Sequence, residues 1–264
     1  MKWVCIGLLL FISIASLAGG YLLKRGDSFE QLSYGRTTVS NGYLVWKDKL
    51  ELQLGTVVVD VQGQQGSDVL LSEITGEIVK AATIASKIVS NLSIKSLTFM
   101  DRDISVDVSQ EERKTYRLKL ASQSTTVDAL LDIDSDRVIA HIEKLSDKQI
   151  GLNVSGDIRF DSSENNMSGS LLADIKNSFP VEMNFETGDQ NISFSGTEAG
   201  AITDIRPLVE LFGLEKNITK WFTDYLTARR YHLISFSGTY ELGNPVSLFH
   251  SFEAEIALDD VEYI

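Results

Sequence analysis

The sequence predicts a mainly β protein of the α+β class, with a few helices, behind one N-terminal transmembrane helix. Three observations lead to this fold class. Residues 3–23 carry no charge, most later segments alternate apolar and polar residues, and two segments change to a helical period. Successive side chains of a strand point to opposite faces, so a period of two indicates strands with one buried face.

Composition limits the classes of partner. The chain has 264 residues, of which 43% are apolar. This is enough to form a sizeable hydrophobic core, so disorder is not expected. The formal net charge of −13 repels phosphate backbones and argues against nucleic-acid binding. It also argues against broad docking of the soluble part onto anionic lipid headgroups. Cys5 is the only cysteine, which excludes an intrachain disulfide and a cysteine-based zinc site.

The first element is a transmembrane signal anchor over residues 1–25. Its uncharged stretch, residues 3–23, spans about 30 Å as a helix, which is enough to cross a bilayer core. A cleaved signal peptide is the alternative, because Ser16 and Ala18 could form a small-residue cleavage site. The apolar run continues to Leu23 before Lys24, which favours an uncleaved anchor. The acidic domain that follows favours export of the bulk of the chain.

Residues 26–42 are polar and contain glycine and serine, so we expect a linker, followed by a β-rich domain over residues 43–264. Short polar connections between the alternating segments predict an antiparallel meander of about ten strands. Three- and four-residue apolar spacing predicts helices near 69–92 and 204–229. The expected strands cover 50–54, 57–61, 104–108, 116–120, 127–131, 150–160, 181–185, 192–194, 234–242 and 248–258.

Strands with one apolar face need a cover for that face. The sheet can curl into a closed core, or it can form a curved groove that shields acyl chains from water. Burial is worth about 0.8 kcal/mol per methylene, so exposing a dozen methylenes costs roughly 10 kcal/mol. Periodicity leaves both readings open. The candidate groove residues are Ile150, Leu152, Val154, Ile158, Met183, Phe185, Ile192, Phe194, Ile234, Phe236, Phe252, Ile256 and Leu258.

Two segments carry a resemblance to a known family. They are NGYLVWKDKLELQLGTVVVDV at 41–61 and KNITKWFTDYLTARRYHLISFSGTYEL at 216–242, where Trp221 ends a short helix before a strand with Gly238. Together with the anchor and the repeated strands, they resemble the AsmA-like envelope proteins, and within these the YhdP type. Typical members are far longer, so the chain would be an N-terminal portion or a short member.

The resemblance implies a bacterial inner-membrane protein with one span and with most of the chain in the periplasm. It also implies an extended β-groove, phospholipid as the partner besides the membrane, and a part in phospholipid movement to the outer membrane. The alternative is a non-catalytic envelope scaffold with a closed β core. Protein partners are not indicated.

No motif points to an enzyme or to a cofactor. The sequence lacks GxSxG, P-loop and GxGxxG patterns, and His141, His232 and His250 have no metal-type spacing. A calcium-loop look-alike is formed by Asp132, Asp134, Asp136 and Glu143. Arg137 stands where such a loop needs glycine, which favours a polar hairpin turn and no metal site.

Overall fold

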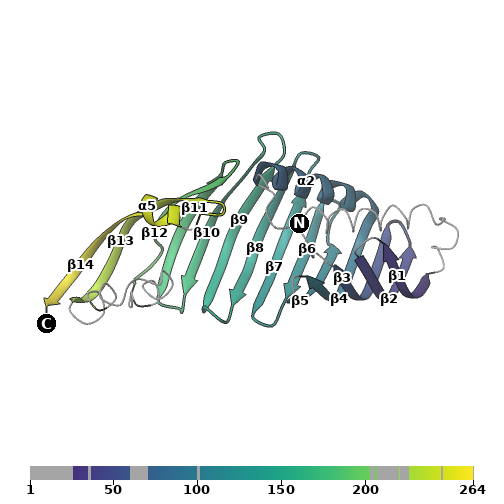
Figure 1. Ribbon diagram of the computed structural model, residues 1–264, viewed down its shortest axis with the longest axis horizontal. Helices are drawn as coiled ribbons and strands as arrows, with labels where there is room; N and C mark the ends of the chain where they lie inside the picture. The colour runs from purple at the N-terminus through teal and green to yellow at the C-terminus, as the bar shows by residue number, and fades with distance from the viewer. Residues whose placement is uncertain are drawn as a thin grey trace.

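Fourteen β-strands lie side by side in chain order in the computed structural model, which describes residues 26–34, 37–59, 71–99, 102–202, 206, 220, 226–244 and 246–263 (Figure 1). The mainly β class with a few helices is therefore confirmed. The strands are β1 (Asp27–Tyr34), β2 (Thr37–Trp46), β3 (Leu50–Val59), β4 (Val89–Phe99), β5 (Arg102–Gln110), β6 (Thr115–Ala121), β7 (Thr125–Ile133), β8 (Arg137–Asp147), β9 (Leu152–Asp161), β10 (Asn166–Ile175), β11 (Phe179–Thr187), β12 (Asn191–Glu198), β13 (Leu226–Glu241) and β14 (Glu253–Tyr263).

Neighbouring strands are antiparallel at every step except one. β3 and β4 are parallel, and the connection between them contains helix α2 (Leu71–Ile88). A parallel pair needs a crossover, because the chain must return to the same end of the sheet before it starts the second strand. The expected meander is thus correct, apart from this one crossover.

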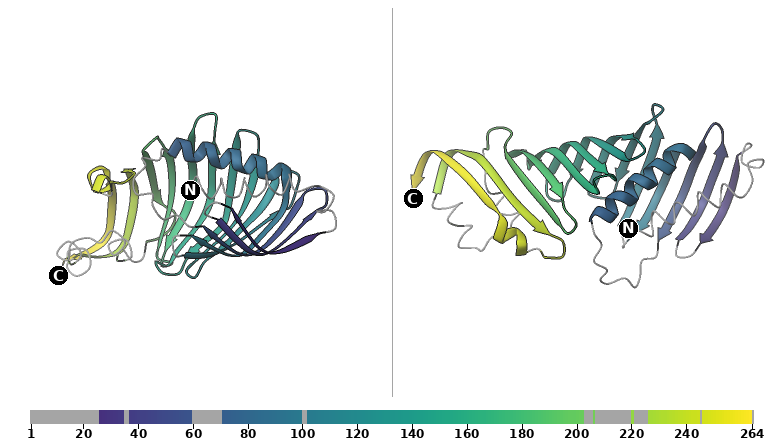
Figure 2. Two further views of the ribbon diagram at one scale, coloured as in Figure 1. Left: turned by 45° about the vertical axis from the view of Figure 1, so that its right-hand side comes forward. Right: turned by 90° about the horizontal axis from the view of Figure 1, so that it is seen from above.

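The sheet is curved and is not closed into a barrel (Figure 2). β1 and β14 are its two edges, and among the described residues neither edge pairs with a further strand. Helix α2 crosses the ends of several strands and contacts β4 and β7–β10. Helix α5 (Val246–Ser251) lies in the connection between β13 and β14.

The segment expected to be a linker, residues 26–42, instead forms β1 and most of β2, so that prediction was wrong. Its glycine and serine are compatible with strands, because β-branched and aromatic residues are interspersed among them. Val39 is buried, and the ring of Phe29 lies against Gly42 on the neighbouring strand. Asn41, between the paired residues Ser40 and Gly42, has a φ of 56°, in the left-handed region that asparagine tolerates better than most residues.

The helix expected over 69–92 ends at Ile88, and Val89 begins β4. The spacing between Val89 and Leu92 is helix-like, but it has another cause. Leu50 pairs with Val89, whereas Leu52 pairs with Leu92, so a register shift adds one residue to β4. A bulge of this kind places two residues three apart on the same face of a strand.

The helical stretch expected near 204–229 overlaps β13, which already begins at Leu226. Arg206 and Lys220 are helical, and the rest of 203–225, including Trp221, lies outside the described residues. Leu248 was expected in the last strand but belongs to α5. Strands β8 and β10 were not among the expected strands.

The expected signal anchor, residues 1–25, lies outside the described residues. Within the part of the chain that the structure describes, neither helix has the length and the apolar character needed to cross a bilayer.

Candidate functional site: the apolar face of the sheet

One face of the sheet is apolar from β2 to β14. A row of paired residues crosses the sheet from β2 to β14. Each member of the row stands directly opposite the next member on the neighbouring strand. Every position in the row is apolar or glycine. The row consists of Leu44, Leu52, Leu92, Val108, Leu118, Ala129, Ile142, Gly156, Leu171, Met183, Gly196, Phe236 and Ala254.

Burial along this row changes from one end to the other. Leu52 is 1% exposed and belongs to a cluster with Leu50, Leu54 and Ile94, packed among β2–β5. In contrast, Leu171, Met183 and Phe236 of β10, β11 and β13 are only half-buried. The described helices do not cover this second stretch, apart from the contacts of α2 at β9 and β10 and of α5 at β13. The central row of β10–β13 is therefore only half-buried. Toward the 176–178 turn the same face is buried, in a cluster of Ile175, Phe179, Val181, Tyr231 and Leu233.

Three aromatic rings lie over neighbouring strands on the half-buried part of this stretch. A Cβ atom on Gly169 would come within 2.5 Å of the Phe185 ring, and one on Gly238 within 2.6 Å of the Phe194 ring. The ring of Phe236 occupies the corresponding space beside Gly196. A glycine opposite an aromatic residue lets the ring rest on the neighbouring backbone, a known way to stabilise strand glycines. These three pairs make a low, continuous apolar floor over β10–β13.

Helix α2 covers one rim of the apolar face. Val79 is 1% exposed and packs against Tyr116, Ile133 and Val138, which stand at the ends of β6, β7 and β8. The first backbone N–H of the helix, at Leu71, donates to the carbonyl of Asp189 in the β11–β12 turn, at 2.8 Å. The helix thus spans the turns on this side of the sheet.

The C-terminal end of α2 is fixed by two polar side chains. Lys49 Nζ donates to the carbonyl of Ser86 at 2.5 Å and lies 2.9 Å from Tyr116 Oη. Tyr116 Oη donates to the same carbonyl at 2.7 Å, and the Tyr116 side chain is buried. Helix ends leave carbonyls without intrahelical partners and favour cations there, so both contacts stabilise this end.

Most of the predicted groove residues lie on the apolar face. Their strand partners place them in register with the row described above. They are Leu152, Val154, Ile158, Met183, Phe185, Ile192, Phe194, Phe236, Ile256 and Leu258.

Three predicted groove residues lie elsewhere. Ile150 is 42% exposed in the β8–β9 turn, because β9 begins only at Leu152. Ile234 is 49% exposed, since a register shift between Leu233 and Ser235 turns it away from the face that holds Leu233. Phe252 lies between α5 and β14, and its N–H donates to the carbonyl of Leu248.

Sequence reasoning missed the contribution of β10 and of the ends of β11 and β13. Alternation in β10 is present but weak, since small residues occupy two of its apolar-face positions and the pair Leu171–Leu172 blurs the period. The pairing of β10 with β9 and β11 identifies its apolar face without ambiguity, but this pairing is known only from the tertiary structure. The missed residues are Leu171, Ala173, Ile175, Phe179, Val181, Tyr231 and Leu233.

The opposite face is polar and is held by cross-strand ion pairs. Arg117 contacts Asp128 at 2.9 Å and Glu143 at 2.5 Å. His141 lies 2.7 Å from Asp157 and 3.3 Å from Asp132, and hydrogen bonding to Asp157 raises the pKa of His141. In the same way His232 bridges two carboxylates, Glu198 at 3.0 Å and Asp259 at 3.1 Å, which raise its pKa.

The calcium-loop look-alike is a β7–β8 hairpin. Asp134 pairs with Lys114 at 2.5 Å, and this pairing lowers the pKa of the Asp134 carboxyl. Glu143 pairs with Arg117, and Asp132 accepts from Thr115 at 2.8 Å. The described residues contain no group of three or more potential metal-ligating side chains in binding geometry. The polar hairpin expected from Arg137 is the observed structure.

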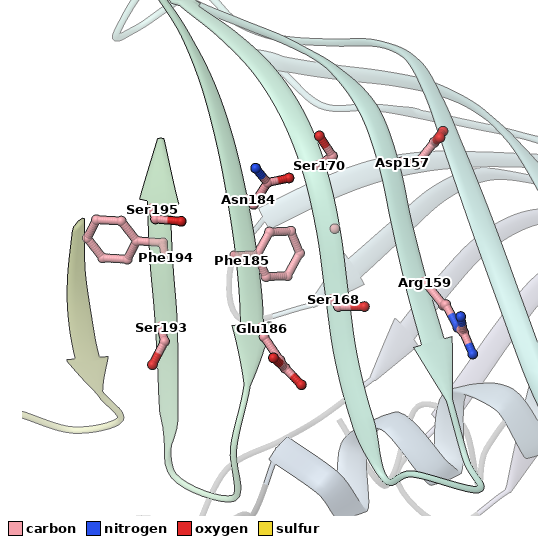
Figure 3. Close-up of a pocket in the computed structure, with 11 residues that line it drawn as sticks. Asp157, Arg159, Ser168, Ser170, Asn184, Phe185, Glu186, Ser193, Phe194 and Ser195 are labelled. Atoms are coloured by element: carbon pink, nitrogen blue, oxygen red, sulfur yellow. The ribbon is translucent and has the colours of Figure 1, made fainter. Parts of the chain in front are cut away.

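A shallow hollow of about 580 Å³ lies on the polar face of β9–β12 (Figure 3). Two cross-strand rows line it, one from Asp157 to Ser195 and one from Arg159 to Ser193. These side chains point away from the apolar face, because they alternate with Gly169, Phe185 and Phe194. Gly169, Phe185 and Phe194, which lie between the two rows, also line this open hollow, so its surface is partly apolar.

Comparisons of the chain with protein-family models, with curated proteins and with solved structures found no match.

Proposed function

We propose that this protein holds the acyl chains of phospholipids against the apolar face of its curved sheet. The observation that carries the proposal is the uninterrupted apolar row from Leu44 to Ala254, together with its half-buried second stretch over β10–β13. Apolar area that is left accessible on a sheet of this length is typical of a binding surface.

The energetics favour acyl chains as the ligand. Each methylene moved from water onto an apolar surface gains about 0.8 kcal/mol, and a flat aromatic floor contacts a chain along its length. The apolar face carries no charged residue in the central row, so a phosphate headgroup has to stay outside it, at a rim.

Location in the bacterial inner membrane, with the sheet in the periplasm, is part of the same proposal. It rests on the uncharged residues 3–23 and on the resemblance to the AsmA-like family. In that setting the protein would be a bridge-like or adaptor component in phospholipid movement to the outer membrane, without enzymatic activity.

The test uses two neighbouring leucines of β10. Leu171 lies on the apolar face, whereas Leu172 is 47% exposed and opposes Ser155 and Glu182 on the polar face. The full-length chain is extracted in detergent, and bound phospholipid is quantified by mass spectrometry. We expect phospholipid with the wild-type protein and with Leu172→Asp, and a loss of most of it with Leu171→Asp.

Absence of phospholipid from the wild-type protein would refute the proposal, as would equal amounts with both variants. A scaffold with a solid core is the second candidate, and the buried cluster of β2–β5 favours it for that end of the sheet. This alternative predicts a crosslinked protein partner and no bound lipid.

A further inference from the structure

The hollow on the polar face of β9–β12 lies between two networks of ion pairs. On one side Arg117 contacts carboxylates of β7 and β8, and on the other His232 bridges carboxylates of β12 and β14. Within the part of the chain that the structure describes, four polar side chains of the hollow make neither a hydrogen bond nor an ion pair. These side chains are Ser168, Ser170, Asn184 and Ser195.

Side-chain size gives the hollow its shape. Residues 168–170 line it from β10, and their short side chains make a low floor. Longer side chains of the two neighbouring strands flank this floor. They are Asp157 and Arg159 on β9, and Asn184 and Glu186 on β11 (Figure 3). Neighbouring strands lie about 4.8 Å apart, so the backbones of β9 and β11 are roughly 10 Å apart. The hollow is thus a trough along β10 that accepts one six-membered ring across its width.

The charged groups of the hollow already have partners. Asp157 lies 2.7 Å from His141, and the guanidinium of Arg159 lies 2.6 Å from the next carboxylate of its own strand. Glu186 accepts a hydrogen bond from the side-chain amide of Asn166 at 3.2 Å. A charged ligand would have to displace these contacts, and the described residues hold no group of three potential metal ligands. The groups without a partner are neutral, so the hollow favours a neutral ligand.

From these observations we infer that the hollow binds a neutral saccharide. Each serine hydroxyl both donates and accepts hydrogen bonds, and the amide of Asn184 does the same. The hydroxyls of a sugar ring have matching donors and acceptors. The C–H groups of the ring need apolar surface, which Gly169, Phe185 and Phe194 add to the lining. A few convergent polar groups beside apolar lining are typical of small-molecule sites.

The regularity of the strands indicates the shape of the saccharide. The pairing of β10 with β9 and β11 has no register shift, and neither has the pairing of β11 with β12. The trough is therefore straight, and it fits an extended β-linked chain better than an α-linked chain, which curves. The inference goes beyond the proposed function, because the hollow lies on the face opposite the apolar row.

The test measures saccharide binding by the full-length protein. The chain is purified in a zwitterionic detergent without a sugar headgroup and is titrated in a calorimeter with cellotetraose or with maltotetraose. These two probes are glucose tetramers that differ only in the linkage, which is β in cellotetraose and α in maltotetraose. We expect cellotetraose to bind more tightly by roughly tenfold or more.

Two substitutions locate the binding site. Ser170→Leu fills the floor of the hollow, and the fold is expected to accept it because Leu172, on the same face of β10, is 47% exposed. Asn184→Ala removes the amide from the wall. Each is expected to weaken cellotetraose binding by roughly tenfold or more, through lost space or lost hydrogen bonds. Ser109→Leu is the matched control, since Ser109 is exposed on the polar face of β5, outside the hollow. It is expected to leave binding unchanged.

The inference is overturned if the wild-type protein does not bind cellotetraose, or if maltotetraose binds as tightly. It is also overturned if Ser109→Leu weakens binding as much as the two hollow variants do. Copurified phospholipid is measured on the same variants and is expected to stay at the wild-type level. Its loss with Ser170→Leu would assign both ligands to one site and overturn the inference. Phospholipid missing from the wild-type protein refutes the proposed function alone.

Discussion

The two ends of the sheet have the same alternating pattern and a different burial. In β2–β5 the apolar positions are held by Leu, Val and Ile, which pack against one another into a buried cluster. In β10–β13 a buried cluster occupies one end of the strands, and at the other end Phe185, Phe194 and Phe236 lie half-buried beside glycines. The cluster consists of Ile175, Phe179, Val181, Tyr231 and Leu233. The first arrangement is buried across the middle of the strands, whereas the second is buried at one end of the strands and half-buried in the middle. The difference teaches that alternation identifies an apolar face but does not say whether that face is filled or accessible.

The largest expected effect comes from the same substitution at each end. Leu52→Ala removes side-chain volume from a fully buried site and is expected to lower the free energy of unfolding by about 2–5 kcal/mol. Leu171→Ala removes it from a half-buried site and is expected to cost about 1 kcal/mol. Urea denaturation of both variants measures the difference. Equal losses would mean that the two ends are covered alike.

A smaller effect is expected at the junction between the two regions. Tyr116→Phe removes the hydroxyl that donates to the carbonyl of Ser86, at the end of α2. The Ser86 carbonyl keeps Lys49, so the loss is about 1–2 kcal/mol rather than that of a fully unpaired buried group. Hydrogen exchange is expected to rise most in the last turn of α2. A uniform rise over the whole sheet would contradict a local role for this contact.

Glycine substitutions sharpen the comparison further. Gly238→Ala places a methyl group against the half-buried Phe194 ring, the only group that the methyl meets, and this ring can shift away. We expect a cost of about 1 kcal/mol or less, and reduced lipid binding because the floor is no longer flat. Gly42→Ala meets the Phe29 ring at the buried end, where the ring packs against a filled cluster. Its cost is expected to be larger, and thermal denaturation of the pair decides the order.

The smallest expected effect is a pH dependence that arises on the polar face. All three histidines lie in the second half of the chain, and carboxylates raise the pKa of His141 and of His232 above the usual value. A raised pKa in the folded state stabilises the fold fully below about pH 6.5, and this contribution is lost as the pH rises through the folded-state pKa.

Because both histidines are substantially exposed, the change is small. The urea midpoint of the wild-type protein is expected to fall slightly between pH 6 and pH 8. The variant with His141→Gln and His232→Gln serves as the control and is expected to lose this difference. An unchanged pH dependence in the control would assign it to other groups.

Much of the fold could be predicted from local pattern, and the errors have identifiable causes. Strand bulges produced two of them. One gave Val89 and Leu92 a helical spacing, and the other turned Ile234 away from the face of Leu233. Strand β10 was missed because glycine, alanine and a leucine pair weaken its alternation, although its register with β9 and β11 is regular. Ile150 was assigned to the face because it extends the alternation of Leu152 and Val154 by one step, into the turn before β9.

The sequence by itself determined that the chain is mainly β, that one face of its strands is apolar, and that a helix interrupts the strands between β3 and β4. These properties are encoded by the period of neighbouring side chains, which needs no knowledge of distant contacts. Only the tertiary structure decided that the sheet stays open and where along its apolar face the buried clusters lie. Each of these depends on strand register and curvature, which are set by contacts between residues far apart in the chain.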